Sequence, residues 1–176
     1  MPTAGLAAPA AATASATPSD AAPMARSWPV AVRIPAIGVD STLISLGLRA
    51  DGTLQVPASG FPAGWYTGAP TPGERGPAII VGHVDWGGDA GVFYRLHDLS
   101  PDDEITVTRA DGSTATFRVT SVAQFPKNRF PTALVYGNLD YAGLRLITCG
   151  GSFDQRAHSY EADTVVFAKL ASSSPA

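Results

Sequence analysis

LRLITCGG, residues 144–151, contains the single cysteine of a chain of 176 residues and places it where a strand is expected to end. Leu144, Leu146 and Ile147 predict a buried or half-buried strand, and the two glycines after Cys149 predict its termination. A lone cysteine is more often a small buried side chain than a reactive one. A thiol at a strand end, with open backbone around it, instead indicates a nucleophile.

The composition bounds the size of the fold and excludes one class of partner. The length suits one domain with a hydrophobic core. With 12 Lys and Arg residues against 15 Asp and Glu residues, the chain lacks the positive charge needed to hold a nucleic acid. No run of 18 strongly apolar residues is present, so this chain is predicted to contain no membrane span. A single cysteine fits either a reducing compartment or an exported protein that needs a thiol.

Two regions differ in composition. Residues 1–27 are mostly Ala, Pro, Ser and Thr. They cannot bury enough apolar area to offset chain entropy, and they are predicted to form a flexible linker. They are unlike a signal peptide, because no basic residue precedes Arg26 and prolines interrupt the alanines. Residues 28–176 are predicted to form the folded domain.

Short apolar or alternating runs separated by turn residues fill the folded region. The clearest is residues 104–125, where two alternating strands flank Asp111-Gly112. Residues 91–99 predict one or two helical turns, and residues 126–143 predict a long ordered loop with a short helix. The other predicted strands cover residues 29–39, 41–48, 54–56, 78–83, 144–148 and 163–170. Seven or eight short strands with little helix predict an all-β, closed or nearly closed barrel.

A cysteine nucleophile needs a base nearby, and His83 is the best candidate. His83 ends an apolar run, AIIVGH, in the same way that Cys149 ends its own. The two are far apart in sequence, so only the fold can bring them together. For each histidine considered alone, a structural or solvated role is more common. His97 lies in a polar turn and is interpreted as solvated, and His158 follows the cysteine closely enough to approach the site.

An arginine is the candidate for stabilising the oxyanion that forms when a carbonyl is attacked. Arg156 lies seven residues after Cys149, in a segment that Gly150 and Gly151 allow to fold back. Arg145 is the competitor on the same strand face. Its Cα lies about 13 Å from that of Cys149 in an extended strand, which is too far for a useful contact. Arg156 is therefore preferred, although surface charge is the common role of a single arginine.

No metal or other cofactor is predicted. There is no second cysteine and no pair of histidines at the spacing of metal ligands. Asp85 and Asp89 in DWGGDAG are too few for a calcium loop and are interpreted as turn residues.

Three motifs resemble those of sortases, the cysteine transpeptidases of Gram-positive cell surfaces. Along the chain they are a histidine segment, a cysteine strand and an arginine, in the same order as in the family. RLITC, residues 145–149, is similar to the family motif TLxTC, with Arg145 in place of the first Thr. Gly82-His83 is similar to the histidine segment, and Arg156 lies near the family's arginine. The residues from Cys149 to Gly151, the pair Phe153-Asp154, and the Ala- and Pro-rich residues 1–27 are most similar to actinobacterial class F sortases. The resemblance covers about residues 30–170.

This resemblance implies a closed eight-stranded barrel with one or two short helices and a two-step reaction. Cys149 is expected to attack the Thr-Gly carbonyl of an LPxTG-like sorting signal, while His83 protonates the leaving amine. Arg156 would hold the substrate and the oxyanion, and Thr148 would shape the site beside the nucleophile. An amine of a cell-wall precursor then resolves the thioacyl enzyme. The replaced Thr and the short Cys-to-Arg spacing mean that class A substrate preference is not transferred.

The resemblance also implies where the protein works. We expect a monomer on the extracytoplasmic face of the plasma membrane, anchored through a segment that this chain does not contain. The protonation state of the pair formed by Cys149 and His83 stays open, and the resemblance favours a neutral pair.

Three other interpretations make different predictions. L,D-transpeptidases also use Cys and His, but their cysteine follows a nearby histidine in an SxGC-type motif that this chain lacks. NlpC/P60 peptidases have the cysteine before the histidine, the reverse of the order here. A non-catalytic surface barrel that binds a peptide or glycan would have an inert cysteine that alkylates slowly.

Overall fold

The computed structural model describes residues 21–176, so residues 1–20 of the predicted linker lie outside the described residues. The regular structure of the described chain is mainly β-strand, with one short α-helix, α1 (Thr132–Tyr136). The strands are β1 (Pro29–Ile34), β2 (Val39–Leu46), β3 (Ala63–Tyr66), β4 (Gly76–Val81), β5 (Asp85–Trp86), β6 (Asp89–Ala90), β7 (Glu104–Arg109), β8 (Thr114–Pro126), β9 (Ala142–Asp154) and β10 (Ser159–Ser174). Three 3-10 helices are η1 (Pro35–Ile37), η2 (Leu96–Asp98) and η3 (Lys127–Arg129).

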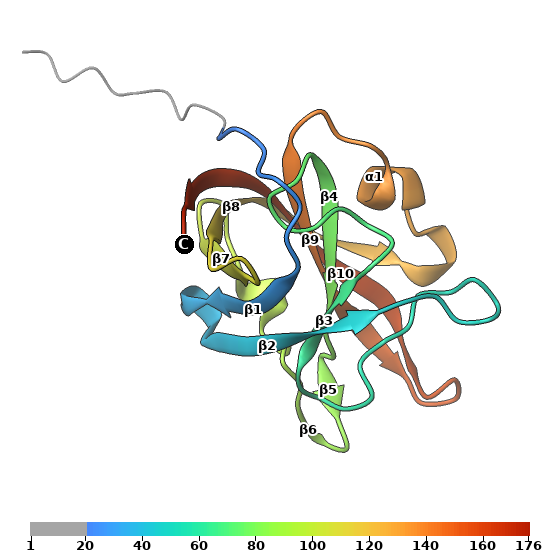
Figure 1. Ribbon diagram of the computed structural model, residues 1–176. Coiled ribbons are helices and arrows are strands. Elements are labelled where there is room, and N and C mark those ends of the chain that lie inside the picture. Colours follow the sequence, from blue (N-terminus) through green and yellow to red (C-terminus); the bar gives the residue numbers. More distant parts are fainter. Residues whose placement is uncertain (1–20) are drawn as a thin grey trace, which may run out of the picture.

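Eight of these strands form a closed barrel in the order β1-β2-β3-β4-β9-β10-β8-β7, as Figure 1 shows. Most neighbours are antiparallel, but β2 pairs with β3 and β4 pairs with β9 in parallel. Strands β5 and β6 form a separate two-stranded hairpin beside the barrel. The predicted all-β, closed eight-stranded barrel is therefore confirmed.

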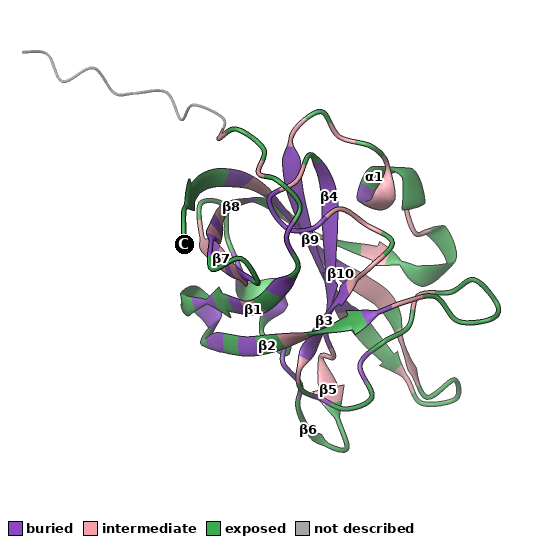
Figure 2. Cartoon of the chain, in the orientation of Figure 1, coloured by how far each residue is buried: buried purple, intermediate pink, exposed green. Residues whose placement is uncertain are grey.

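The alternation of side chains along β9 creates two hydrophobic layers. Leu144 and Leu146 point into the main core of the barrel, whereas Ile147 belongs to a second cluster on the outer face. Ile79 and Val81 of β4 join this outer cluster, which Val135 of α1 covers. Strand β4 is consequently buried along its whole length, as Figure 2 shows. Burial on both faces explains why its sequence is a continuous apolar run rather than an alternating one.

The prediction that the strand ends at the glycines after Cys149 is wrong. Strand β9 continues through Gly150 and Gly151 to Asp154, because the long strand β10 supplies hydrogen-bond partners beyond the cysteine. The register shifts between Tyr160 and Ala162, opposite Gly151, whose φ is +72°. The glycine thus serves a β-bulge rather than a strand terminus. Only the pairing with β4 ends here, at Ile147.

Other local predictions agree in type and differ in extent. The hairpin around Asp111-Gly112 is confirmed as β7 and β8. The strand predicted over residues 29–39 is divided by η1, which Pro35 begins and Gly38 ends in a left-handed conformation. Residues 54–56 form no strand, only an isolated bridge between Leu54 and Leu48. The segments 91–99 and 126–143 hold the expected short helices, η2 in the first and η3 with α1 in the second.

Residues 21–27, which the sequence assigns to the linker, lie against the barrel. The backbone N–H of Met24 donates to the carbonyl of Gly73 at 2.8 Å, and that of Ser27 donates to Thr71 Oγ1 at 3.2 Å. The buried guanidinium of Arg109 donates to the carbonyl of Ala25. The described end of the predicted linker is thus in contact with the folded domain before residue 28.

Candidate active site

Cys149 is a half-buried free thiol on the outer face of β9. Its side chain has the same parity along the strand as Ile147, which belongs to the outer hydrophobic cluster. The opposite residue on β10 is Asp163. The nucleophile predicted from the sequence therefore lies outside the barrel core, where the pairing between β4 and β9 ends.

The register of the two parallel strands ends two residues before His83 and two residues before Cys149. The last pair is Val81 with Ile147, and the N–H of Gly82 still donates to the carbonyl of Ile147 at 3.1 Å. Two residues further along each strand are His83 and Cys149. Both residues therefore lie close to the end of the pairing between β4 and β9.

Contacts of the His83 ring determine which nitrogen is available for proton transfer. The ring nitrogen Nε2 lies 2.7 Å from the carbonyl of Pro57, and the ring packs against Trp86 with centroids 4.9 Å apart. A carbonyl only accepts hydrogen bonds, so Nε2 must carry the proton of that bond. In the neutral ring Nδ1 is then the basic atom that can take a proton and later release it.

Cys149 opens into a hollow of about 270 Å³ at the rim of the barrel. Tyr94 and His97 line it from the segment around η2, and Tyr160 lines it from β10. Thr148, the predicted substrate-binding residue, also lines it; its side chain is 4% exposed, and Oγ1 has no hydrogen-bond partner among residues 21–176. His97, which is interpreted from the sequence as solvated, lines the same hollow as the thiol. His83 is not among the residues that line this hollow.

The sequence analysis missed Lys127, which contacts the sulfur. Its amine lies 3.6 Å from Cys149 Sγ and 3.2 Å from Ser159 Oγ. Lys127 begins η3, in the segment that the sequence marked only as a long ordered loop. Lys127 lies in a loop without periodicity, and no spacing pattern relates it to Cys149. The sequence therefore gave no indication that its amine contacts the sulfur.

Burial raises the pKa of the Cys149 thiol above its ordinary value. The positive charge of Lys127 opposes this rise, and the negative charge of Asp163 adds to it. The balance favours the neutral thiol at neutral pH, in agreement with the neutral pair that the resemblance favours.

The two arginines considered from the sequence lie in different surroundings. Arg156 is exposed on the turn between β9 and β10, where its backbone N–H donates to Asp154 Oδ1 at 2.8 Å. It does not line the hollow around Cys149. Arg145 is 3% exposed, and its guanidinium lies over the ring of Phe167 at 4.6 Å. His158, also on the turn, is exposed.

A tyrosine bridges the two loops beside the hollow. The hydroxyl of Tyr160 on β10 donates to Asp85 Oδ2 of β5. This hydrogen bond and the charge of Asp85 raise the pKa of Tyr160 to about 12. The phenol therefore stays protonated at neutral pH, and its hydrogen bond connects the β5-β6 hairpin to β10.

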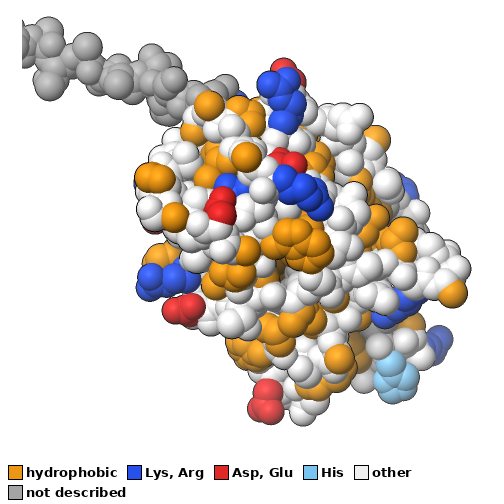
Figure 3. Space-filling model, viewed as in Figure 1, with side chains coloured by type: hydrophobic (Ala, Val, Ile, Leu, Met, Phe, Trp, Pro, Cys, Tyr) orange, Lys and Arg blue, Asp and Glu red, His pale blue; other side chains and the backbone are white. Residues whose placement is uncertain are grey.

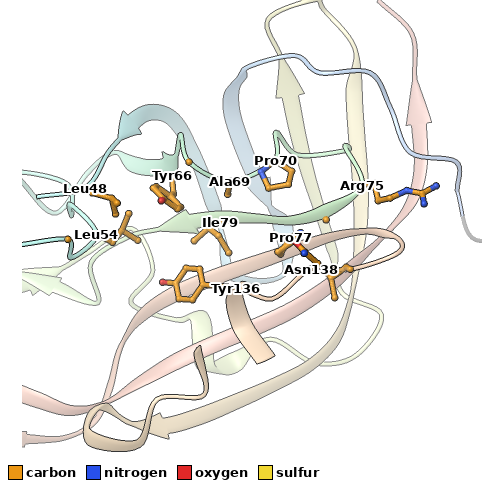
Figure 4. A pocket seen from close by; sticks show the side chains of 14 residues that line it. Leu48, Leu54, Tyr66, Ala69, Pro70, Arg75, Pro77, Ile79, Tyr136 and Asn138 are labelled. Carbon is orange, nitrogen blue, oxygen red and sulfur yellow. The ribbon is translucent and has the colours of Figure 1, made fainter. Parts of the chain in front are cut away.

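A larger groove of about 770 Å³ lies on the outer face of β4, before the strand reaches His83. Figure 4 shows Tyr66, Ile79 and Tyr136 gathered around it, from β3, β4 and α1. Leu48 and Leu54 line one end. The groove is lined mostly by apolar side chains and follows β4 toward the end from which His83 continues.

On the face seen in Figure 3, Lys and Arg side chains lie singly among apolar and neutral ones rather than in one broad patch. Within residues 21–176, no three His, Cys, Asp or Glu side chains gather as metal ligands. Over the same residues, none of the helices is long and apolar enough to cross a membrane.

Gly91 positions the segment that carries His83. A Cβ built there would lie 2.2 Å from the carbonyl oxygen of His83, which accepts from the N–H of Phe93 at 3.0 Å. We expect Gly91→Ala to displace this backbone, to destabilise the domain by about 1–3 kcal/mol and to reduce activity more than stability alone explains. Gly47→Ala, where the nearest atom is at 3.6 Å, is the matched control. Melting curves and initial rates check both; equal behaviour of the two variants would contradict the prediction.

Comparison with known proteins agrees with this geometry. The family model described as the sortase domain matches residues 32–171. A lid mutant of sortase A from Corynebacterium diphtheriae is similar in structure, with a TM-score of 0.64, 20% identity, and coverage of 85% of this chain and 73% of that one. Sortase A from Listeria monocytogenes has a TM-score of 0.64 and 16% identity, covering 84% of this chain and 89% of that one.

Sortase C1 from Streptococcus agalactiae has a TM-score of 0.62 and 17% identity, covering 80% of this chain and 66% of that one. No curated protein sequence matches the chain. At these identities the solved structures establish the fold, whereas the family model extends over most of the chain. With its closed barrel and its single cysteine beside the histidine segment, this chain belongs to the sortase family.

Proposed function

We propose that the protein is a cysteine transpeptidase that cleaves an LPxTG-like sorting signal between Thr and Gly and joins the acyl part to an amine of a cell-wall precursor. Sortase membership implies a cysteine transpeptidase that uses sorting signals and amine nucleophiles. The observation that supports the proposal is the register of β4 and β9, whose last pair, Val81 with Ile147, lies two residues before His83 and two residues before Cys149.

The first half of the reaction forms a thioester. The sulfur of Cys149 attacks the Thr carbonyl, and the thiol proton passes to His83 Nδ1. When the tetrahedral intermediate collapses, the C–N bond to glycine breaks and His83 returns that proton to the leaving amine. The Pro57 carbonyl accepts from Nε2 at 2.7 Å, which holds the ring and stabilises its protonated form.

The second half exchanges the sulfur for the acceptor. The amine attacks the thioester carbonyl, His83 takes a proton from the amine, and the sulfur leaves and is protonated again. The raised pKa of Cys149 favours a neutral resting thiol, so the proton transfer to His83 belongs to the attack itself.

We assign Arg156 to the substrate and its oxyanion, and Thr148 to the floor of the site. The exposed turn that carries Arg156 follows the cysteine strand directly, so the guanidinium can turn toward a bound peptide without breaking a core contact. Thr148 lines the hollow beside the nucleophile, and its buried hydroxyl has no hydrogen-bond partner among residues 21–176.

The apolar groove along β4 suits the part of the sorting signal before the cleaved bond. Its lining by Leu48, Leu54 and Tyr136 fits the Leu and Pro side chains of an LPxTG-like sequence. The extended backbone of a peptide lying there would run with the strand toward His83 and Cys149.

We place the reaction on the extracytoplasmic face of the plasma membrane and assign it to a monomer. Within the family, the CGG and FD residues after Thr148 and the Ala- and Pro-rich residues 1–27 favour the actinobacterial class F subtype.

The test is incubation of the protein with an LPxTG-containing peptide and a glycine or diamino nucleophile, followed by mass spectrometry. A peptide joined to the added amine supports transpeptidation. Hydrolysis without joining would leave a cysteine peptidase and reject the acceptor. If no product forms across variants of the motif and the thiol alkylates slowly, the non-catalytic surface barrel is the better description.

A further inference from the structure

Lys127 contacts the reacting atom of the site. Its amine lies 3.6 Å from Cys149 Sγ, within reach of a weak hydrogen bond to sulfur, and a second bond at 3.2 Å to Ser159 Oγ fixes its direction. The two candidates from the sequence make different contacts: His83 Nε2 binds the Pro57 carbonyl, and Arg156 lies on the exposed turn.

The fold explains why this lysine reaches the thiol. Lys127 follows directly on Pro126, the last residue of β8, which pairs with Ala162 of β10. Strand β10 also pairs with β9, so it lies between β8 and the cysteine. The lysine side chain therefore spans the edge of β10, where Ser159 holds it, and ends at the sulfur.

We propose that Lys127 is a further catalytic residue, whose ammonium stabilises the thiolate of Cys149 as the thiol gives up its proton. The inference rests on the proposed cysteine chemistry. In this step the thiol proton goes to His83 Nδ1, and the ammonium supplies a positive charge beside the negative sulfur. It contributes in attack, and again when the sulfur leaves the thioester.

Other charged and titratable groups also face the thiol, and they set the background against which Lys127 acts. Asp163 and Asp85 oppose ionisation of the sulfur. Tyr160 stays protonated, as its bond to Asp85 requires. The remaining titratable groups are Tyr94 and His97, which line the hollow, and His83, which follows the end of the β4–β9 pairing. Because Asp163 and Asp85 both oppose ionisation of the thiol, we expect removal of the Lys127 ammonium, which contacts the sulfur, to have the largest effect on that ionisation.

The size of the effect is limited by exposure. Two unit charges 4 Å apart in water interact by about 1 kcal/mol, which corresponds to roughly a fivefold change in an equilibrium. The Lys127 side chain is exposed, so this water-like value applies and salt should screen it. We therefore expect removal of the ammonium to lower the thiolate fraction at a fixed pH below the thiol pKa by about three- to tenfold.

The test measures the rate of alkylation of Cys149 by iodoacetamide against pH, in low and high salt. Lys127→Gln removes the charge, Lys127→Arg keeps it, and Arg129→Gln removes a charge from the same 3-10 helix as the matched control. The midpoint should rise for Lys127→Gln, stay near the wild-type value for Lys127→Arg, and stay unchanged for Arg129→Gln. High salt should move the wild-type midpoint toward that of Lys127→Gln.

Alkylation does not depend on the peptide substrate, so the result separates this inference from the proposed function. A shifted midpoint with no peptide joining would support the role of Lys127 and reject the transpeptidase. Equal midpoints for the wild type and a folded Lys127→Gln variant would overturn the role of Lys127 and leave the transpeptidase intact. A fall in melting temperature without a shifted midpoint would show a structural role only and would also overturn the proposal.

Discussion

Replacing Cys149 by alanine is expected to abolish formation of the peptide–amine product, a loss of roughly 10⁴-fold or more in rate. The thioester cannot form without the sulfur, and the described residues around the hollow offer no second thiol. Mass spectrometry of the joined product against a dilution series of authentic standard measures the residual rate. A mass increase equal to the acyl part, present in the wild type and absent in Cys149→Ala, would identify the intermediate.

The alanine variant should remain folded. Cys149 lies on the outer face and is only partly buried, so its truncation should cost about 1 kcal/mol of stability or less. Cys149→Ser is the second control, since it keeps a hydroxyl in nearly the same volume. Product formation by Cys149→Ala at more than a small fraction of the wild-type rate would rule out the cysteine mechanism.

Replacing His83 by glutamine is expected to lower the rate of joining by about 10²- to 10⁴-fold, the usual range for a general acid–base residue. The glutamine amide can still donate toward the Pro57 carbonyl, so the local backbone should keep its position. It cannot carry a proton from the thiol to the leaving amine, which is the function assigned to Nδ1. Initial rates with saturating peptide and amine check the prediction.

His97→Gln is the matched control, because His97 lines the hollow around Cys149 and is paired with Asp98 at 3.1 Å. We expect a change of less than about threefold for this variant, the ordinary effect of a surface substitution. A larger loss in His97→Gln than in His83→Gln would reassign the base to His97 and refute the argument from the strand register.

The local sequence determined several of the strands and, within them, which face each side chain takes. Alternation around Asp111-Gly112 predicted the β7-β8 hairpin, because side chains of successive strand residues point to opposite faces. The continuous apolar run of β4 and the alternation along β9 likewise follow from how many faces of each strand are covered.

The strand predictions were wrong where pairing with a segment remote in sequence decided the secondary structure. Gly150 and Gly151 look like a strand end, yet β10 pairs beyond them and converts the second glycine into a bulge. Residues 54–56 look like a strand but find no full partner. Local propensity identifies what a segment can form, and the available pairing partner decides what it does form.

The sequence by itself determined that one cysteine is available as a nucleophile and that a histidine follows an apolar run. It also determined the order of the motifs that indicate a sortase. Only the tertiary structure decided that β4 and β9 are parallel neighbours, whose pairing ends at Val81 and Ile147, two residues before His83 and Cys149. Only it brought Lys127 to the sulfur across β10. Strand pairing and contacts across strands join residues remote in sequence, and no periodicity within a segment encodes its register with another.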